Sequence, residues 1–163
     1  MIFTIILLFK IEQKNFKEIG WKSTNIIRDI GIGIAFCILL LIISTILMIT
    51  AQIIVLTEIN ITFDKFFTAL FFALGAIYED CLFRGYFQQE LEKTYSSKKS
   101  ILIQSLTFLF INLFYFPFDI SGIINYIVLF IMAIIIGFLA KKYSLYSANA
   151  THFFFILIAG LLI

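Results

Sequence analysis

Two acids and an arginine interrupt an apolar stretch of the sequence, AIYEDCLFRGYF at residues 76–87. Asp80 and Arg84 are four residues apart, so on a helix they share a face and can form an ion pair. Glu79 points about 100° away from Asp80 and needs a partner from another helix. Ionisable side chains inside a membrane are costly and usually mark a functional site, such as a substrate site or a proton relay. These three residues are therefore the first candidates.

Asn112 and His152 can join them, because both lie at a similar depth within their own apolar segments. Counted at about 1.5 Å per residue from the basic ends of the segments, Glu79 lies roughly 16 Å, Asn112 roughly 18 Å and His152 roughly 15 Å inside. Side chains on different spans meet only where their depths agree. The expected site consists of Glu79, Asp80, Arg84, Asn112 and His152.

A purely structural explanation competes with this one. The acids and the arginine could form a neutral buried cluster that packs helices, with Asn112 and His152 as hydrogen-bond partners between helices. Each charge would cost up to about 2.5–3.5 kcal/mol at the centre of a bilayer, and each Leu, Ile or Phe returns only about 0.3–0.6 kcal/mol. The polar segment SLYSANATHFF favours a function, because water could reach it and let the imidazole titrate or donate.

The composition indicates a membrane protein. Hydrophobic residues make up 62% of the 163 and charged residues only 13%, which is more apolar surface than a soluble domain of this size can bury. Apolar blocks of about twenty residues predict five spans, near 30–57, 66–87, 101–116, 121–140 and 143–163. The opening MIFTIILLF is too short to span and is expected to form a short hydrophobic helix. The predicted fold class is an all-α polytopic membrane bundle.

Small residues precede the acids in their span. Ala69, Ala73 and Ala76 lie on the helix face of Asp80, and Gly75 lies one turn before Glu79. Neighbouring helices could therefore approach closely at both places.

The basic residues are distributed unevenly. Ten of the twelve lysines and arginines fall in three polar stretches, one before the first span, one in ELEKTYSSKK and one at Lys141 and Lys142. These stretches share one side if the spans alternate, and basic loops are typically cytoplasmic. We therefore expect the site to open toward the cytoplasm. The formal net charge of +2 gives no indication of nucleic-acid binding.

Residue types exclude several membrane proteases. A site-2-type metalloprotease needs H-E-x-x-H, and the chain has one histidine. A presenilin-type site pairs two aspartates from different helices, whereas Asp80 is the only aspartate expected at depth. A rhomboid-like pair of Ser105 and His152 would lack a glycine-flanked nucleophile turn.

Three ordered motifs resemble those of one family. YEDCLFRGYFQQELEK resembles the E-E-x-x-x-R signature of the CAAX-protease and bacteriocin-processing (CPBP) intramembrane peptidases. SLTFLFINLF is similar to the second motif, F-x-x-x-H, with Phe108 in register. GFLAKKYSLYSANATHFFFI is similar to the third, H-x-x-x-N or H-x-x-x-small, with His152 in register. The resemblance covers roughly residues 66–156.

The resemblance implies peptide hydrolysis within the membrane. In this family a glutamate and a histidine activate water, and a further histidine and an asparagine stabilise the oxyanion. By position, Glu79 would be the general base or a metal ligand, Arg84 its counter-ion and His152 the group that polarises the carbonyl.

The sequence departs from the family pattern at three positions. Asp80 replaces the second glutamate, Asn112 replaces the water-activating histidine and Ile156 replaces the final polar residue. An amide cannot accept a proton at neutral pH, and loss of general-base help typically slows a reaction about a hundred- to ten-thousand-fold.

We expect two regions in the chain. Residues 1–65 hold the N-terminal stub, a cytoplasmic amphipathic loop and the first full span, and residues 66–163 form the CPBP-like membrane domain. The expected function is an intramembrane endopeptidase of the bacterial cytoplasmic membrane that cleaves a peptide or the C-terminal tail of a membrane-associated protein. Two alternatives stay open: a catalytically impaired member that binds peptides, in bacteriocin immunity or as an adaptor, and a small transporter subunit that uses the charges as a proton relay.

The expected partners are the lipid bilayer and a peptide or membrane-protein substrate, with no nucleic acid. The sequence leaves open whether a divalent metal cofactor is bound. Glu79 and His152 are its only plausible ligands.

Overall fold

The computed structural model describes residue 15 and residues 17–50 and 61–162. The expected N-terminal hydrophobic helix and the end of the first expected span, at residues 51–57, lie outside the described residues. Every regular element of the described part is helical, which confirms the all-α fold class. In chain order the elements are α2 (Ile26–Thr50), α3 (Phe63–Asp80), η2 (Cys81–Phe87), α4 (Gln88–Glu92), α5 (Ser97–Ile111), α6 (Ile120–Lys142) and α7 (Leu145–Leu162).

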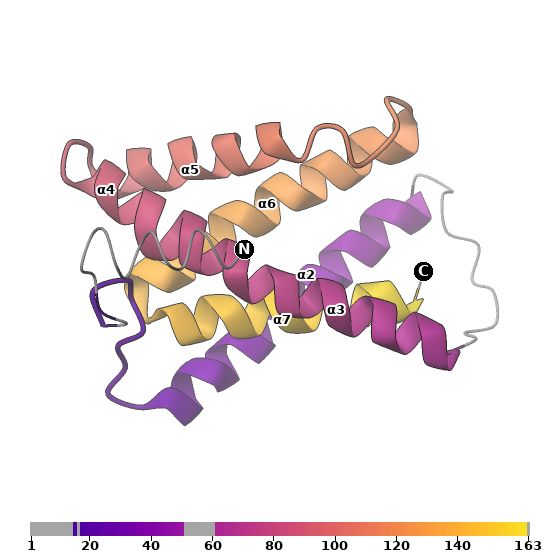
Figure 1. The fold of residues 1–163 in the computed structure, drawn as a ribbon. Helices are drawn as coiled ribbons and strands as arrows, with labels where there is room; N and C mark the ends of the chain where they lie inside the picture. The colour runs from indigo at the N-terminus through magenta and orange to yellow at the C-terminus, as the bar shows by residue number, and fades with distance from the viewer. Residues whose placement is uncertain (1–14, 16, 51–60, 163) are drawn as a thin grey trace.

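Helix α7 is the centre of the bundle, because it packs against α2, α3, η2 and α6. In Figure 1, α5 lies along α6 on one side of the molecule, and α3 lies along α7 on the other. The two sides meet where α6 packs against α7 and α2 and where η2 reaches α5 and α6. A residue on α7 can therefore face side chains from both halves of the molecule.

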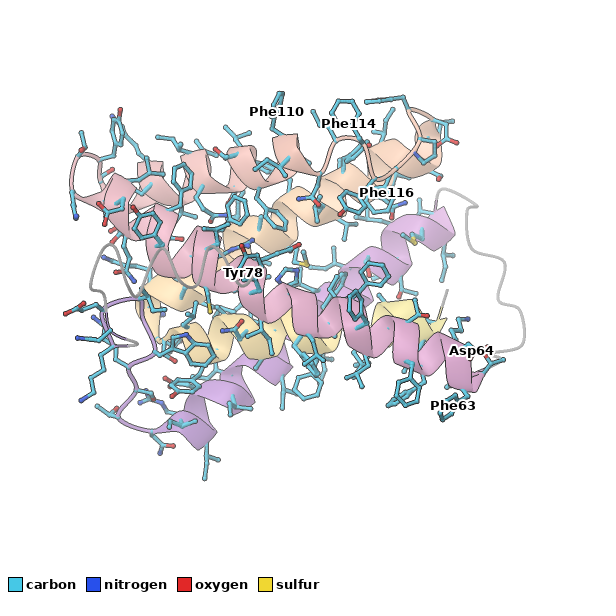
Figure 2. All side chains as sticks on the ribbon, viewed as in Figure 1. Phe63, Asp64, Tyr78, Phe110, Phe114 and Phe116 are labelled. Atoms are coloured by element: carbon cyan, nitrogen blue, oxygen red, sulfur yellow. The ribbon has the colours of Figure 1, made fainter. Side chains whose placement is uncertain are left out.

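Four helical segments in the described ranges are long and apolar enough to cross a membrane: Ile26–Thr50, Phe63–Glu92, Ile120–Lys142 and Leu145–Leu162. Large apolar side chains cover their outer faces. Ile27 of α2 and Phe71 of α3, for example, are 85% and 74% exposed. Outside these four segments, Phe110 of α5 and Phe114 also point away from the bundle in Figure 2. Such a surface suits the hydrocarbon of a bilayer.

The expected count of about five spans is not confirmed. Helix α5 has 15 residues, so it is about 22 Å long and shorter than the roughly 20 residues that a span needs. It ends because Asn112 turns back on it, with its amide donating to the carbonyl of Phe108 at 2.7 Å. The hydroxyl of Tyr126 then bonds to the carbonyls of Leu113 and Phe116 and fastens the connection to α6.

Small residues bring α3 and α2 close to α7. Ala69, Ala73 and Ala76 are buried, as expected from their spacing, and a Cβ on Gly160 of α7 would lie 3.0 Å from the Cβ of Ala69. The expectation for Gly75 was wrong for the described part of the chain, where no atom lies within 4 Å of the position of a Cβ on Gly75. The alanine face of α3, which ends at Asp80, is therefore the one that meets α7.

The contact between α2 and α7 is closer still. A Cβ on Gly33 would lie 2.5 Å from the carbonyl oxygen of Ser147 and 2.7 Å from the Cβ of Ala150. The hydroxyl of Thr151 donates to the Gly33 carbonyl at 2.9 Å. Close backbone approach of this kind is how helices associate within a membrane.

The first prediction concerns this contact. Gly33→Ala should lower the free energy of unfolding by about 1–3 kcal/mol, because the added methyl group forces α2 away from α7. Gly31→Ala is the matched control, since no atom of residues 17–50 or 61–162 lies within 4 Å of its Cβ position. Thermal unfolding in detergent should show a lower midpoint for the Gly33 variant only. Equal midpoints for the two variants would contradict the observed helix contact.

Candidate functional site

Asp80, the last residue of α3, is fully buried and joins two other ionisable side chains. Its Oδ1 lies 3.1 Å from Nη1 of Arg84 and 3.1 Å from Nδ1 of His152 on α7. Arg84 and His152 are each only 2% exposed. The predicted ion pair between Asp80 and Arg84 is therefore present, and it extends to the chain's only histidine.

The helix changes its geometry at this point. Cys81–Phe87 forms a π-helix, which begins directly after Asp80 and contains Arg84. Wider turns of this type are rare and often occur at functional sites. The backbone of Gly85 lies against the chain before α2, since a Cβ there would be 2.7 Å from the carbonyl oxygen of Ile19.

Phe108 of α5 completes the cluster from a third helix. Its ring centroid lies 4.3 Å from Cζ of Arg84 and 6.1 Å from the ring centroid of His152. The guanidinium therefore has a cation–π contact on one side and the Asp80 carboxylate on another. Phe108 was not among the candidate residues, although its register in the second motif was the signal that could have selected it.

The Arg84 contacts are electrostatic and are not aligned hydrogen bonds. The distance of 3.1 Å to Asp80 is that of an ion pair. Yet the three guanidinium nitrogens have no hydrogen-bond partner among the described residues. The same is true of Oδ2 of Asp80. Buried charged groups are normally both paired and hydrogen-bonded, so this site retains open donors and an open acceptor.

Glu79 lies next to this cluster and is partly exposed. It is close enough to His152, Asp80 and Arg84 for their charges to interact. Of the five candidates, the structure thus joins Asp80, Arg84 and His152 by direct contacts inside the bundle and places Glu79 within range of their charges.

Asn112 is placed differently. It lies one turn beyond Phe108 at the end of α5, and its Nδ2 is bound to the Phe108 carbonyl of its own helix. Asn112 thus contacts Phe108, and it is the ring of Phe108 that lies near Arg84 and His152. Asn149, which was not selected from the sequence, is buried three residues before His152, and its amide has no partner in the described part of the chain.

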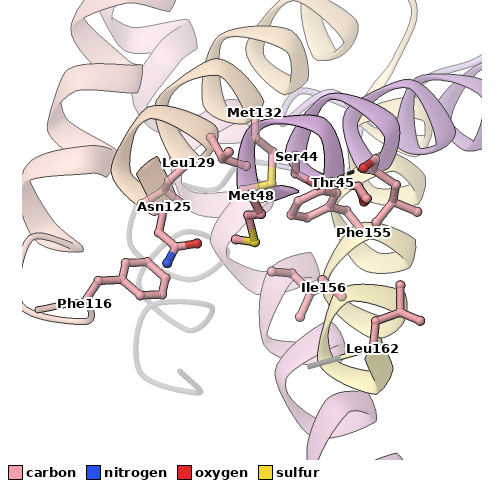
Figure 3. Close-up of a pocket in the computed structure, with 13 residues that line it drawn as sticks. Ser44, Thr45, Met48, Phe116, Asn125, Leu129, Met132, Phe155, Ile156 and Leu162 are labelled. Carbon is pink, nitrogen blue, oxygen red and sulfur yellow. Dashed lines mark hydrogen bonds between the residues drawn. The ribbon is translucent and has the colours of Figure 1, made fainter. Parts of the chain in front are cut away.

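An apolar cavity of about 190 Å³ lies one helical turn beyond His152. Figure 3 shows Ile156 and Phe155 of α7 on one side of this cavity and Met48 and Met132 on the other. Ile156 was expected to remove a polar group from the site, and the surroundings here are correspondingly apolar.

The metal question depends on the ligand set. No three side chains of His, Cys, Asp or Glu within the described ranges come together as a metal site would require. Glu79 and His152 are a smaller set than the three or four protein ligands typical of zinc.

The hydrogen bond to Asp80 determines what His152 can do. A carboxylate next to Nδ1 keeps the proton on that nitrogen and leaves Nε2 free for a substrate. The protonated ring can donate from Nε2 to a developing negative charge, while Glu79 offers a carboxylate beside it.

Comparison with known protein families gives an independent result. The model of the type II CAAX prenyl endopeptidase Rce1-like family matches residues 60–158, well over half of the chain, and this range contains all five candidate residues. Neither the curated proteins nor the solved structures that were compared with the chain gave a match. The resemblance inferred from the three motifs is thereby confirmed, and with four apolar helices the chain is an integral membrane protein. It belongs to the Rce1-like family of type II CAAX prenyl endopeptidases.

Proposed function

We propose that this protein is an intramembrane endopeptidase that cleaves a peptide, or the C-terminal tail of a membrane-associated protein, from the cytoplasmic side. The family supports an intramembrane peptidase of the CAAX-protease kind. The observation that carries the proposal is the contact of 3.1 Å between Asp80 and His152, next to Glu79. It places the imidazole of His152 beside the carboxylate of Asp80, with Glu79 within range of the charge on the imidazole.

In the proposed reaction Glu79 takes a proton from a water molecule while the water oxygen attacks the carbonyl carbon of the peptide bond. The carbonyl oxygen becomes an oxyanion, which His152 stabilises by donating from Nε2. The carbon–nitrogen bond then breaks, and the proton held by Glu79 passes to the leaving amine. One water is consumed for each bond cleaved.

Asp80 and Arg84 act through these two residues. In this reaction Asp80 accepts a hydrogen bond from the N–H at Nδ1 of His152 and stabilises the positive charge of the imidazolium ring. Arg84 balances the charge of Asp80, so that the buried carboxylate is not left uncompensated. Both are positioning residues, because neither has to touch the substrate.

The distribution of basic residues supports access from the cytoplasm. Lys93 follows α4 and Lys141 lies in the last turn of α6. A contact of 2.5 Å between Lys141 and Glu92 places these two helix ends together. Basic groups concentrate on the cytoplasmic side of membrane proteins. That this membrane is the cytoplasmic membrane of a bacterium is part of the proposal.

A second function is favoured by one observation. His152 is the only histidine, and the amide of Asn112 is bound to its own helix. A family member that lacks a second histidine to activate water could retain the site to bind peptides and no longer cleave them.

A glutamate variant tests the proposal. Glu79→Gln should reduce cleavage about a hundred- to ten-thousand-fold, because the amide cannot take the proton from water. The assay is mass spectrometry of a peptide library incubated with purified protein in detergent. Asp64→Asn, at the far end of α3, is the matched control and should cleave normally. Cleavage by the Glu79 variant at the normal rate would exclude Glu79 as the base, whereas peptide binding by the unmodified protein without any cleavage would favour the second function.

A substitution at position 112 should raise the cleavage rate. Asn112→His should raise the cleavage rate about tenfold or more, because it supplies the missing proton acceptor. Leu113→His, one residue further, is the control and should give no gain. A folded Asn112 variant that cleaves no faster would show that this position lies outside the reacting centre.

A further inference from the structure

Asn149 of α7 carries a buried amide that nothing in the described part of the chain satisfies. The residue is 6% exposed, and neither Nδ2 nor Oδ1 has a hydrogen-bond partner among the described residues. Buried amides are normally bonded, because an open donor or acceptor away from water destabilises the fold. Lipid cannot replace the missing partner in a membrane domain. This amide therefore requires a partner of another kind.

The register of α7 places Asn149 beside the candidate site. Leu145, one turn before it, contacts η2, since a Cβ on Gly85 would lie 3.4 Å from Cδ2 of Leu145. His152, one turn after it, lies 3.1 Å from Asp80. Residues three and four apart share a face of a helix, so Asn149 faces η2 between these two contacts.

The other open groups of the site do not bond to Asn149. Oδ2 of Asp80 is an open acceptor, and the guanidinium of Arg84 has open donors. Each could pair with one end of the amide, and neither bond is present among the described residues. One turn beyond His152 this face of α7 becomes apolar, with Ile156 in the lining of the apolar cavity. A substrate at His152 thus finds its next polar group on α7 at Asn149.

The chemistry of the amide indicates the ligand. Its Nδ2 donates and its Oδ1 accepts, so a partner that satisfies both ends must offer an acceptor and a donor. A peptide group offers both, through its C=O and its N–H. A carboxylate has no donor, and a hydrocarbon chain has neither group.

The spacing from His152 indicates which peptide group this is. Three residues of helix correspond to a rise of about 4.5 Å, and an extended peptide advances about 3.3 Å per residue. The group at Asn149 is therefore the neighbour of the one whose carbonyl His152 polarises. A peptide can enter between α7 and η2, because α7 packs closely on α2 and α3 but only lightly on η2. Cys81 and Leu82 of η2 are also only partly buried.

We propose that Asn149 binds the backbone of the substrate. Its Nδ2 donates to the carbonyl, and its Oδ1 accepts from the N–H, of the peptide group next to the cleaved bond, toward the basic end of the bundle. This contact does not depend on the side chains of the substrate, so it selects an extended peptide and not a particular residue. The inference rests on the proposed function and adds a substrate-binding residue to it.

Thermal unfolding in detergent tests whether the amide has a partner within the chain. Asn149→Leu keeps the shape of the side chain and removes its polar atoms, so the midpoint should stay the same or rise. Asn149→Thr is the second variant, in case leucine overpacks the site, because threonine bonds its hydroxyl to its own helix. A lower midpoint for both variants would show that the amide bonds within the chain and would overturn the inference.

Kinetics with a peptide that the unmodified protein cleaves test the ligand. Asn149→Leu should raise KM about tenfold and leave kcat within about twofold, because the contact holds the substrate equally before and during the reaction. Asn125→Leu, at a half-buried position of α6, is the matched control and should cleave normally. N-methylation of the bound peptide group removes its N–H, so it should raise KM for the unmodified protein and much less for Asn149→Leu.

The outcomes separate this inference from the proposed function. If Asn149→Leu cleaves the peptide with an unchanged KM, a trapped water satisfies the amide; the inference is overturned and the proposed function stands. If the unmodified protein binds peptides of the library without cleaving them, the proposed function fails, and the inference predicts about tenfold weaker binding by Asn149→Leu. An absence of peptide binding would overturn both.

Discussion

The rest of the site depends on the contacts of the Asp80 carboxylate with Arg84 and His152. The carboxylate is fully buried, and one of its oxygens lies 3.1 Å from both Arg84 and His152. Removing one partner from such a buried pair typically costs about 3–5 kcal/mol, because the other charge is left alone. The three side chains therefore have to come together in the folded protein, and the helices that carry them must place them at the same depth in the membrane.

Small residues make this meeting possible. The alanine face of α3 packs on α7 near Gly160, and Gly33 of α2 packs on the backbone of Ser147 on the other side of α7. Both contacts hold α7 where His152 can reach Asp80. The π-helix that follows Asp80 carries Arg84 and places its guanidinium against the ring of Phe108. Packing thus determines the chemistry that the polar residues can perform.

Much of this arrangement could be predicted from the sequence. The helical class followed from apolar block lengths, and the similar depth of Glu79 and His152 followed from counting residues from the basic ends, because the rise of a helix is constant. The same count put Asn112 at this depth, but it could not show that the Asn112 amide bonds to Phe108 of its own helix. The length of α5 could not be predicted in this way. Its apolar residues continue past Ile111, but the amide of Asn112 bonds back to Phe108 and ends the helix.

Other features depend on tertiary contacts that leave no periodic signal. The π-helix has no distinct residue pattern, and the role of Phe108 arises only when α5 meets η2 and α7. The close approach of Gln88 and Gln104 likewise requires Gly137, from a third helix, because a Cβ there would lie 3.0 Å from Oε1 of each. The positions of these two glutamines in the sequence do not reveal that they lie close to one another.

The hydrogen bond between His152 and Asp80 can be observed directly, because His152 is the only histidine in the chain. Nitrogen NMR of a sample labelled in histidine gives the protonation of each ring nitrogen without overlap. The structure predicts a protonated Nδ1 whose signal shifts in Asp80→Asn. An unprotonated Nδ1, or a signal that is unchanged in a folded Asp80 variant, would contradict the site described for this protein.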